Sequence, residues 1–338
     1  MSNYLVSGAT GYVGQEVIRH LIAGGHKVVA ISRRSPPLNV QHICKDITKT
    51  LKDIQLGIPI DYILHLASLP GDTGNPEEML NVNAMGCLNV LEWARVLNVK
   101  HIVVASSISA YEWYPATKYS PPDYLPIDEM HPCRPKDMYS VTKRIQELLC
   151  QTYYYQYNVP VTCLRLTAVI GPDGQGGGRS WRIIAQELSE GETVRIPHFS
   201  KEEICHYVDI RDVARMLIAA SQSEATIGEI FNCCGPKAVS GEQFEKVITD
   251  IFPNKKVVYG YPWSMAQGGH IEFSMEKAKK LFGFEPNYDV HSSILYIKEW
   301  IDNGGLRQNI SREEAFANGI ENLTCPPILV PVSELVEI

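Results

Sequence analysis

The chain has 338 residues, of which 45% are hydrophobic and 20% are charged, and its formal net charge is −7 at neutral pH. This is the composition of an ordinary globular protein with enough apolar material for a large core. The acidic balance gives no sign of nucleic-acid binding, and no apolar run reaches the about 18 residues that a membrane-spanning helix needs.

The N-terminal residues and the cysteine spacing bear on the cellular location and on metal binding. The N-terminal residues lack the basic and apolar regions of a signal peptide. The nine cysteines are scattered, with no CxxC pair and no zinc-like spacing of Cys and His. We therefore expect a cytoplasmic protein with reduced thiols, no membrane association and no metal site.

The first half of the chain alternates short apolar runs with helical segments. Helical periodicity is found over residues 13–23, 83–98 and 140–157. The apolar runs show no polar alternation and cover residues 4–7, 27–32, 62–67, 101–107 and 161–166. Such strands, separated by helices, predict a doubly wound α/β fold with a parallel sheet buried on both faces.

The character of the chain changes at residue 171. Residues 171–180 form a glycine-rich loop, and a strand-like start runs into a helix over residues 208–222. Further helices are predicted over residues 181–191, 240–252, 274–283 and 291–305. No internal repeat and no low-complexity linker separates the two halves.

The segment GATGYVG at residues 8–14 follows the first strand and opens the first helix. Glycines at this point permit a tight turn and let backbone N–H groups approach a pyrophosphate at the helix N-terminus. The alternative is a strand–helix turn without a ligand. The βα pattern that follows favours a dinucleotide site.

The end of the second strand bears on the choice of cofactor. An acidic residue there binds the ribose hydroxyls of NAD, but this chain has Arg33 and Arg34. Two guanidinium groups suit a 2′-phosphate and favour NADP over NAD, although a solvated arginine pair is the alternative. The carboxylate of Asp46 can accept a hydrogen bond from the adenine amino group.

Tyr139 and Lys143 are spaced i, i+4 and therefore lie on one face of a predicted helix. A neighbouring ammonium lowers the pKa of a phenol, so Tyr139 is predicted to act as general acid and base between an alcohol and a ketone. Ser106 and Ser107 follow a buried strand, at the sheet edge where ligands bind. A serine hydroxyl there can hold the substrate oxygen.

The chain resembles the extended short-chain dehydrogenases/reductases of the sugar-nucleotide epimerase/dehydratase type. The motifs above carry this resemblance together with others that follow in the family's order, among them SSISAY, PIDEMHPCRPKDMYSVTK, LRLTAVIGP and HYVDIRDVA. The resemblance spans residues 1 to about 302 and implies Ser107, Tyr139 and Lys143 as the catalytic triad. It implies a Rossmann domain over residues 1–170, a smaller substrate lobe mainly over 171–305 with segments returning to the Rossmann domain, and an extension over 306–338. The cofactor residues predicted with it are Gly8, Thr10, Gly11, Tyr12, Val13, Gly14, Arg33, Arg34, Asp46, Ile47, Leu66, Ala67, Ser68, Asn83, Ser106, Tyr139, Lys143 and Leu166.

Two departures from the family pattern concern the substrate. The acidic residues that dehydratases place after the catalytic serine are Ile108 and Ser109 here, which disfavours a 4,6-dehydratase. The arginine that holds a sugar-nucleotide diphosphate is replaced by Cys205. The side chains predicted to line the substrate are Tyr111, Arg179, Arg182 and His206, although a packed aromatic loop and a structural histidine are the alternatives for Tyr111 and His206.

Three functions compete. The first is an NAD(P)-dependent epimerase that acts on a sugar or nucleotide-sugar hydroxyl through a transient ketone. The second is an NADP-dependent carbonyl reductase or dehydrogenase of a non-nucleotide substrate, and the third is a non-catalytic cofactor-binding scaffold or redox sensor. The motif set favours the first, and the resemblance implies a homodimer built on the helices at about residues 83–97 and 139–157.

Overall fold

The computed structural model describes residues 1–69, 75–111, 121–172, 179–260 and 269–307. One seven-stranded sheet, parallel throughout, has the strand order β11-β6-β5-β4-β1-β2-β3. Its strands are β1 (Asn3–Ser7), β2 (Lys27–Ser32), β3 (Gln41–Cys44), β4 (Tyr62–His65), β5 (His101–Ser107), β6 (Val161–Leu166) and β11 (Ile230–Cys233). The predicted α/β Rossmann fold is confirmed.

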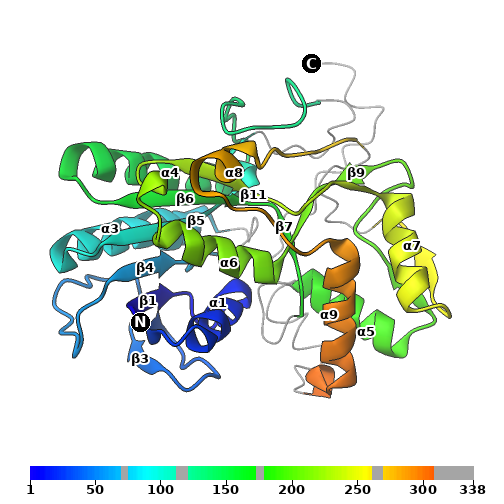
Figure 1. The fold of residues 1–338 in the computed structure, drawn as a ribbon, viewed down its shortest axis with the longest axis horizontal. Helices are drawn as coiled ribbons and strands as arrows, with labels where there is room; N and C mark the ends of the chain where they lie inside the picture. The colour runs from blue at the N-terminus through cyan, green and yellow to red at the C-terminus, as the bar shows by residue number, and fades with distance from the viewer. Residues whose placement is uncertain (70–74, 112–120, 173–178, 261–268, 308–338) are drawn as a thin grey trace.

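Helices cover both faces of the sheet (Figure 1). Along β1, Leu5 packs into the core on the side of α3 and α4, whereas Tyr4 and Val6 pack into the core on the side of α1 and α6. Because both faces are buried, the strands need apolar residues at every position. These helices are α1 (Tyr12–Ala23), α3 (Gly86–Leu97), α4 (Met138–Tyr157) and α6 (Ile210–Ser221), with α8 (Glu276–Phe282) and the short helix η3 (Glu224–Thr226) beside them.

The segment before α3 differs from the predicted single helix over residues 83–98. It consists of a short α-helix, α2 (Pro76–Met79), and a π-helical turn, η1 (Leu80–Met85). A π-helical turn changes the direction in which side chains project, and such turns are frequent at functional sites. Here it turns Asn83 into the protein interior.

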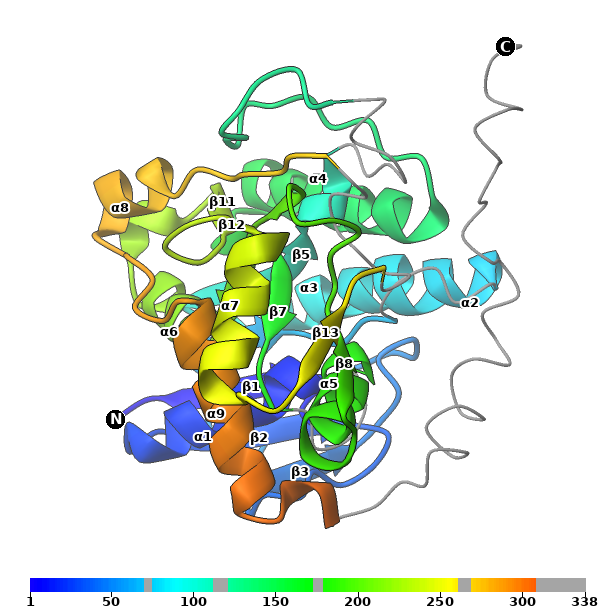
Figure 2. The ribbon, with the colours of Figure 1, turned by 90° about the vertical axis from the view of Figure 1, so that its right-hand side faces the viewer.

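A second lobe stands beside the carboxyl ends of the strands (Figures 1 and 2). Its apolar core takes Tyr111 and Ile127 from the first half of the chain as well as side chains from the second half. The strand β11 and the helix α6 return from the second half to the large sheet and its cover. The elements of this lobe are β7 (Ala168–Ile170), α5 (Arg179–Glu190), β8 (Thr193–Arg195), β9 (Ile204–Cys205), β10 (Tyr207–Asp209), β12 (Val239–Ser240), α7 (Gly241–Ile251), β13 (Lys256–Val258), α9 (Val290–Asp302) and η4 (Gly305–Arg307).

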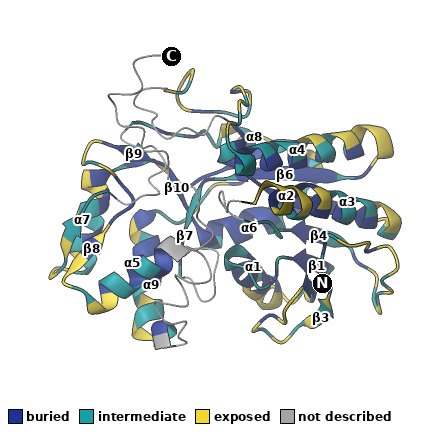
Figure 3. Ribbon diagram, turned by 180° about the vertical axis from the view of Figure 1, so that it is seen from behind, coloured by how far each residue is buried: buried dark blue, intermediate teal, exposed yellow. Residues whose placement is uncertain are grey.

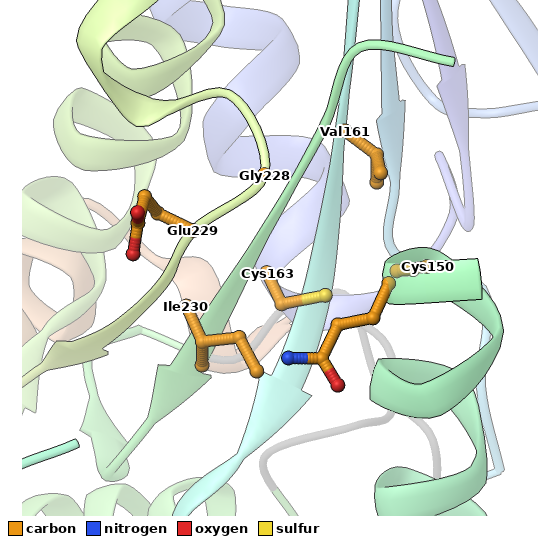
Figure 4. A pocket seen from close by; sticks show the side chains of 7 residues that line it. Cys150, Val161, Cys163, Gly228, Glu229 and Ile230 are labelled. Atoms are coloured by element: carbon orange, nitrogen blue, oxygen red, sulfur yellow. The ribbon is translucent and has the colours of Figure 1, made fainter. Parts of the chain in front are cut away.

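The sheet order reverses at β1, which pairs with β2 on one side and β4 on the other. Ligands of such sheets bind in the crevice at the carboxyl ends of the strands near this reversal. The pocket in Figure 4 lies elsewhere, against the amino-terminal half of β6 beside Val161 and Cys163. It holds no room for a ligand, because its space of about 170 Å³ is a shallow depression that includes open solvent. In the described part of the chain, no helix is long and apolar enough to cross a membrane.

Candidate active site

The glycine turn is shaped by its own backbone. Gly8 has a φ of +71°, a conformation that favours glycine, and its carbonyl accepts a hydrogen bond of 2.9 Å from the N–H of Gly11. A Cβ on Gly8 would lie 2.7 Å from the backbone nitrogen of Ala67, and a Cβ on Gly14 would lie 2.2 Å from the carbonyl oxygen of Gly8. No side chain caps the N-terminus of α1, and its first turn holds no acidic residue. This cradle fits the pyrophosphate of a dinucleotide.

The adenosine end of the crevice combines positive and negative groups. Arg33 and Arg34 are exposed directly after β2. Burial raises the pKa of Asp46, but hydrogen bonds from Thr48 and the positive charge of Arg33 outweigh it and hold the pKa below its usual value. Asp46 is therefore an anion beside a cation at neutral pH. The side chain of Ile47 is buried in the core on the side of α3, and its contact with the cofactor stays a prediction.

The loop after β4 is held by hydrogen bonds to two side chains, those of Ser7 and Asn83. The hydroxyl of Ser7 accepts from the N–H groups of Leu66 and Ala67, at 3.1 and 3.3 Å. The side-chain oxygen of Asn83 accepts from the Ser68 hydroxyl and from the N–H of Leu69, at 2.9 and 2.7 Å.

The amide of Asn83 is fully used inside the protein. Its nitrogen donates to the carbonyl of Leu69 at 3.2 Å and to the hydroxyl of Thr142 at 3.0 Å, and the side chain is buried. The contact of Asn83 with the cofactor stays a prediction. Asn83 positions the loop of Ser68 and Leu69 against α4.

Ser106 and Ser107 are the last two residues of β5, and both hydroxyls meet side chains of α4, Glu147 and Tyr139 respectively. The hydroxyl of Ser106 donates to Glu147 at 2.8 Å inside the core, and its place among the cofactor residues stays a prediction. The hydroxyl of Ser107 accepts from the N–H of Ser109 at 3.1 Å and donates to the Ser109 hydroxyl at 3.0 Å. In the sequence, Ser109 stands at a position where dehydratases of this family have an acidic residue. The structure shows that Ser109 orients the Ser107 hydroxyl.

Tyr139 and Lys143 lie one turn apart on α4, and both reach the end of β5. Tyr139 is hydrogen-bonded to Ser107. The ammonium of Lys143 donates to the carbonyl of Ala105 at 2.9 Å and lies 5.7 Å from the ring centre of Tyr139. The structure thus brings the three predicted catalytic residues together at the carboxyl end of β5.

The protonation of this group differs from the sequence-based expectation. Burial raises the pKa of Tyr139 to about 12, and its hydrogen bond to Ser107 opposes this rise. Burial also lowers the pKa of Lys143 to about 8. Since the Lys143 ammonium is bound to Ala105, Tyr139 keeps its proton at neutral pH and can donate it to a carbonyl oxygen.

Two of the predicted substrate residues lie in the interior. The hydroxyl of Tyr111 donates to the side-chain oxygen of Asn232 at 2.7 Å, and the Arg165 guanidinium lies 4.2 Å from its ring centre. The ring of His206 accepts from the N–H of Phe273 at 3.0 Å and donates to the Gly235 carbonyl at 2.9 Å. Both side chains are occupied by structural contacts, because each joins segments that are far apart in the sequence.

The remaining substrate predictions concern the second lobe. Arg182 is buried on α5, and Cys205 is buried on β9 where the family pattern has an arginine. Arg179 begins α5, but its side chain lies outside the described part of the structure, as do residues 112–120 of the aromatic segment.

Comparison with known proteins agrees with this geometry. The sequence signature of the NAD dependent epimerase/dehydratase family matches residues 4–234. A probable UDP-glucuronate 4-epimerase of Rhizobium meliloti is 30% identical, over 90% of this chain and 98% of the relative. The UDP-glucuronate 4-epimerase of Thermodesulfobacterium geofontis is 26% identical, over 89% and 96% of the two chains.

The fold is shared with solved structures. The crystal structure of the UDP-glucose 4-epimerase of Thermotoga maritima, with UDP-glucose, superposes with a TM-score of 0.77 at 24% identity, over 89% of this chain and 99% of that one. The family signature covers the glycine cradle, Ser107 and the Tyr139–Lys143 pair. The chain therefore belongs to the NAD-dependent epimerase/dehydratase family of enzymes, as its motifs had predicted.

Proposed function

We propose that this enzyme is a nucleotide-sugar epimerase that inverts a hydroxyl-bearing carbon through a transient ketone. The observation that carries the proposal is the convergence of Ser107, Tyr139 and Lys143 at the end of β5, beside the glycine cradle. Among the relatives that match about nine tenths of the chain, two bear the name of UDP-glucuronate 4-epimerase, one that of a putative UDP-glucose 4-epimerase and two that of a UDP-glucuronic acid decarboxylase, which supports a UDP-sugar as substrate.

The chemistry divides simply among these side chains. When bound, the nicotinamide accepts a hydride from the substrate carbon and returns it. Tyr139, which carries its proton at neutral pH, gives that proton to the ketone oxygen as the alcohol re-forms. To take the hydroxyl proton in the oxidative half it must be a phenolate, the form that the Lys143 cation favours, and Ser107 holds the oxygen in both directions. Inversion of the carbon would require the ketone to turn within the site before the alcohol re-forms, with Ser107 and Tyr139 binding its oxygen in both orientations.

The first experiment denatures the purified protein and identifies any released dinucleotide and its redox state. The same preparation is incubated with UDP-glucose and UDP-glucuronate, and the 4-epimers are followed by proton NMR. Near-stoichiometric bound cofactor and an epimer without net oxidation support the proposal. An empty protein that consumes NADPH while it reduces carbonyl compounds contradicts it and favours the reductase, which the buried Cys205 would suit.

We also propose that the 2′-phosphate of NADP binds at Arg33. The support is the exposed pair Arg33 and Arg34 after β2, where an NAD enzyme has an acidic residue. A charged hydrogen bond contributes about 1.5–3 kcal/mol, so we expect Arg33→Ala to weaken NADP binding by about 10- to 100-fold. NAD binding should change little.

Calorimetric titration of both dinucleotides checks this prediction. Arg95→Ala is the matched control, because Arg95 is an exposed arginine on α3 that binds Glu92 of the same helix. Equal losses for NAD and NADP in the Arg33 variant would contradict a phosphate contact.

We further propose a homodimer through α3 and α4, which contact each other on one face of the sheet (Figures 1 and 3). Leu148 and Tyr155 are seven residues apart on one face of α4 and are 47% and 76% exposed. Met85 and Val96 are exposed on the neighbouring helices. An apolar stripe of this kind marks an interface.

We also propose a cytoplasmic location. The eight cysteines of the described residues are free thiols, which suits a reducing compartment.

The variant Leu148→Asp/Tyr155→Asp is expected to be monomeric, because two charges would be buried without partners at the interface. Light scattering measures the mass in solution. Met130→Asp is the control, since Met130 is an exposed apolar side chain in a loop outside these helices. A monomeric wild-type protein would contradict the proposal.

A further inference from the structure

A buried carboxylate lies directly behind the proposed catalytic residues. Glu147 follows Tyr139 by eight residues and Lys143 by four, so the three side chains share one face of α4. Glu147 is 0% exposed. Its oxygens accept hydrogen bonds from the Ser106 hydroxyl at 2.8 Å, from Arg165 at 2.8 Å through two nitrogens, and from Arg144 at 2.9 Å.

These bonds join the elements that carry the site. Ser106 precedes Ser107 on β5, Arg165 lies on β6, and Glu147 lies on α4 with Tyr139 and Lys143. A two-pronged contact between guanidinium and carboxylate fixes direction as well as distance. The pair therefore sets the register of α4 against the strand end that presents Ser107.

The network continues into the second lobe. Arg165 stacks on the ring of Tyr111, which closes the turn after Ser107, and the Tyr111 hydroxyl donates to Asn232. The amide of Asn232 donates to the carbonyl of Ile127 at 3.0 Å. Ile127 forms a bridge with Phe273 and packs in the core of the second lobe. The side chains that hold α4 are thus connected to the lobe predicted to bind the substrate.

Glu147 also acts on the charge of Lys143. The ionisable groups that surround the Lys143 ammonium are Glu147 and Tyr139 on its own helix, Cys87 on α3 and Cys163 on β6. Burial is the main influence and lowers the pKa of Lys143, whereas the charges of Cys87, Glu147 and Cys163, in that order, raise it. Among the described residues, Glu147 is the carboxylate that opposes the loss of the proton.

We propose that Glu147 and Arg165 are a positioning pair, which aligns Tyr139 and Lys143 with Ser107, places a carboxylate in the surroundings of the Lys143 ammonium, and couples this alignment to the second lobe. The inference rests on the proposed function, because it concerns the same three side chains. Neither residue need touch the substrate.

The test uses the full-length protein and the variant Glu147→Gln, which keeps the shape of the side chain and removes its charge. Carbon-13 NMR of protein labelled at the lysine Cε, recorded at graded pH, reports the titration of the buried Lys143 without any substrate and without a reagent that must reach it. We expect Lys143 in the variant to titrate about one pH unit lower than in the wild type. The value of kcat should fall by about tenfold or more while KM stays nearly unchanged.

Two further variants guard against a purely structural effect. Asp209→Asn is the matched control, because it removes a buried carboxylate charge bound by two nitrogens of Arg211, outside the sheet. It should lower the melting temperature without moving the Lys143 titration. The double variant Glu147→Gln/Arg165→Met leaves no unpaired charge from the pair and is expected to fold, with the same lowered titration.

The outcomes separate the inference from the proposed function. An unchanged Lys143 titration in both Glu147 variants overturns the inference, whatever the wild type catalyses. A lowered titration together with a wild type that epimerises no UDP-sugar sustains the positioning role of the pair and refutes the proposed function. A lowered titration in Asp209→Asn as well would show a general loss of packing and overturn the inference.

Discussion

The variant Tyr139→Phe is expected to lose about 10²- to 10⁴-fold in kcat, the usual contribution of a positioned general acid or base. Only the hydroxyl is removed, and this is the group that is hydrogen-bonded to Ser107 at the end of β5. Binding of the dinucleotide should be nearly unchanged, because the glycine cradle lies on another loop. Steady-state kinetics and a cofactor titration measure the two effects separately.

Tyr153→Phe is the matched control for this loss. Tyr153 lies on the same helix, is buried, and donates its hydroxyl to Glu92 at 2.8 Å on the outer side of the sheet. The same atom is removed from the same helix without touching the site. If Tyr139→Phe retained turnover within a factor of about three, the proton transfer assigned to Tyr139 would be wrong.

The second large effect is expected at the glycine cradle. A Cβ at Gly14 would lie 2.2 Å from the carbonyl oxygen of Gly8 and 3.1 Å from the Cα of Ala9. Both neighbours are backbone atoms that cannot rotate away, so the turn must shift. Overpacking of this kind costs about 1–3 kcal/mol, and the displaced amides would weaken dinucleotide binding by about 10- to 100-fold in Gly14→Ala.

Gly57→Ala supplies the comparison, since a Cβ at Gly57 has no atom within 4 Å. Titration with dinucleotide and a thermal melt should show losses for the Gly14 variant and almost none for the Gly57 variant. Binding in Gly14→Ala equal to that of the wild type would show that the pyrophosphate is held elsewhere.

The protonation of the site links activity to pH. With the pKa of Lys143 lowered to about 8, the ammonium is lost above that pH, and with it the cation that favours the phenolate of Tyr139. The contribution of Lys143 to the free energy of unfolding changes with pH in the opposite direction to the activity. Between pH 8 and the ordinary pKa of lysine the unfolded chain binds more protons at this position than the folded chain, so this group makes folding more favourable as the pH rises. A decline of activity above pH 8 therefore reports on the site and not on unfolding of the protein.

The sequence by itself determined the sheet, the glycine turn and the spacing of Tyr139 and Lys143. Each depends on a local pattern: apolar runs without alternation, glycines between a strand and a helix, and residues four apart on one helix. Near neighbours in the chain are near in space in these elements, so the motif and the geometry coincide.

Only the tertiary structure decided which of the other polar side chains face the crevice. Ser106 turns to Glu147, Tyr111 donates to Asn232, and His206 is held by Phe273. These partners are 41, 121 and 67 residues away along the chain, and no local periodicity encodes them. The pKa of Tyr139 is likewise set by burial among distant segments. A polar residue near a motif can serve the ligand or the interior, and long-range packing makes that choice because a buried polar group must find a partner.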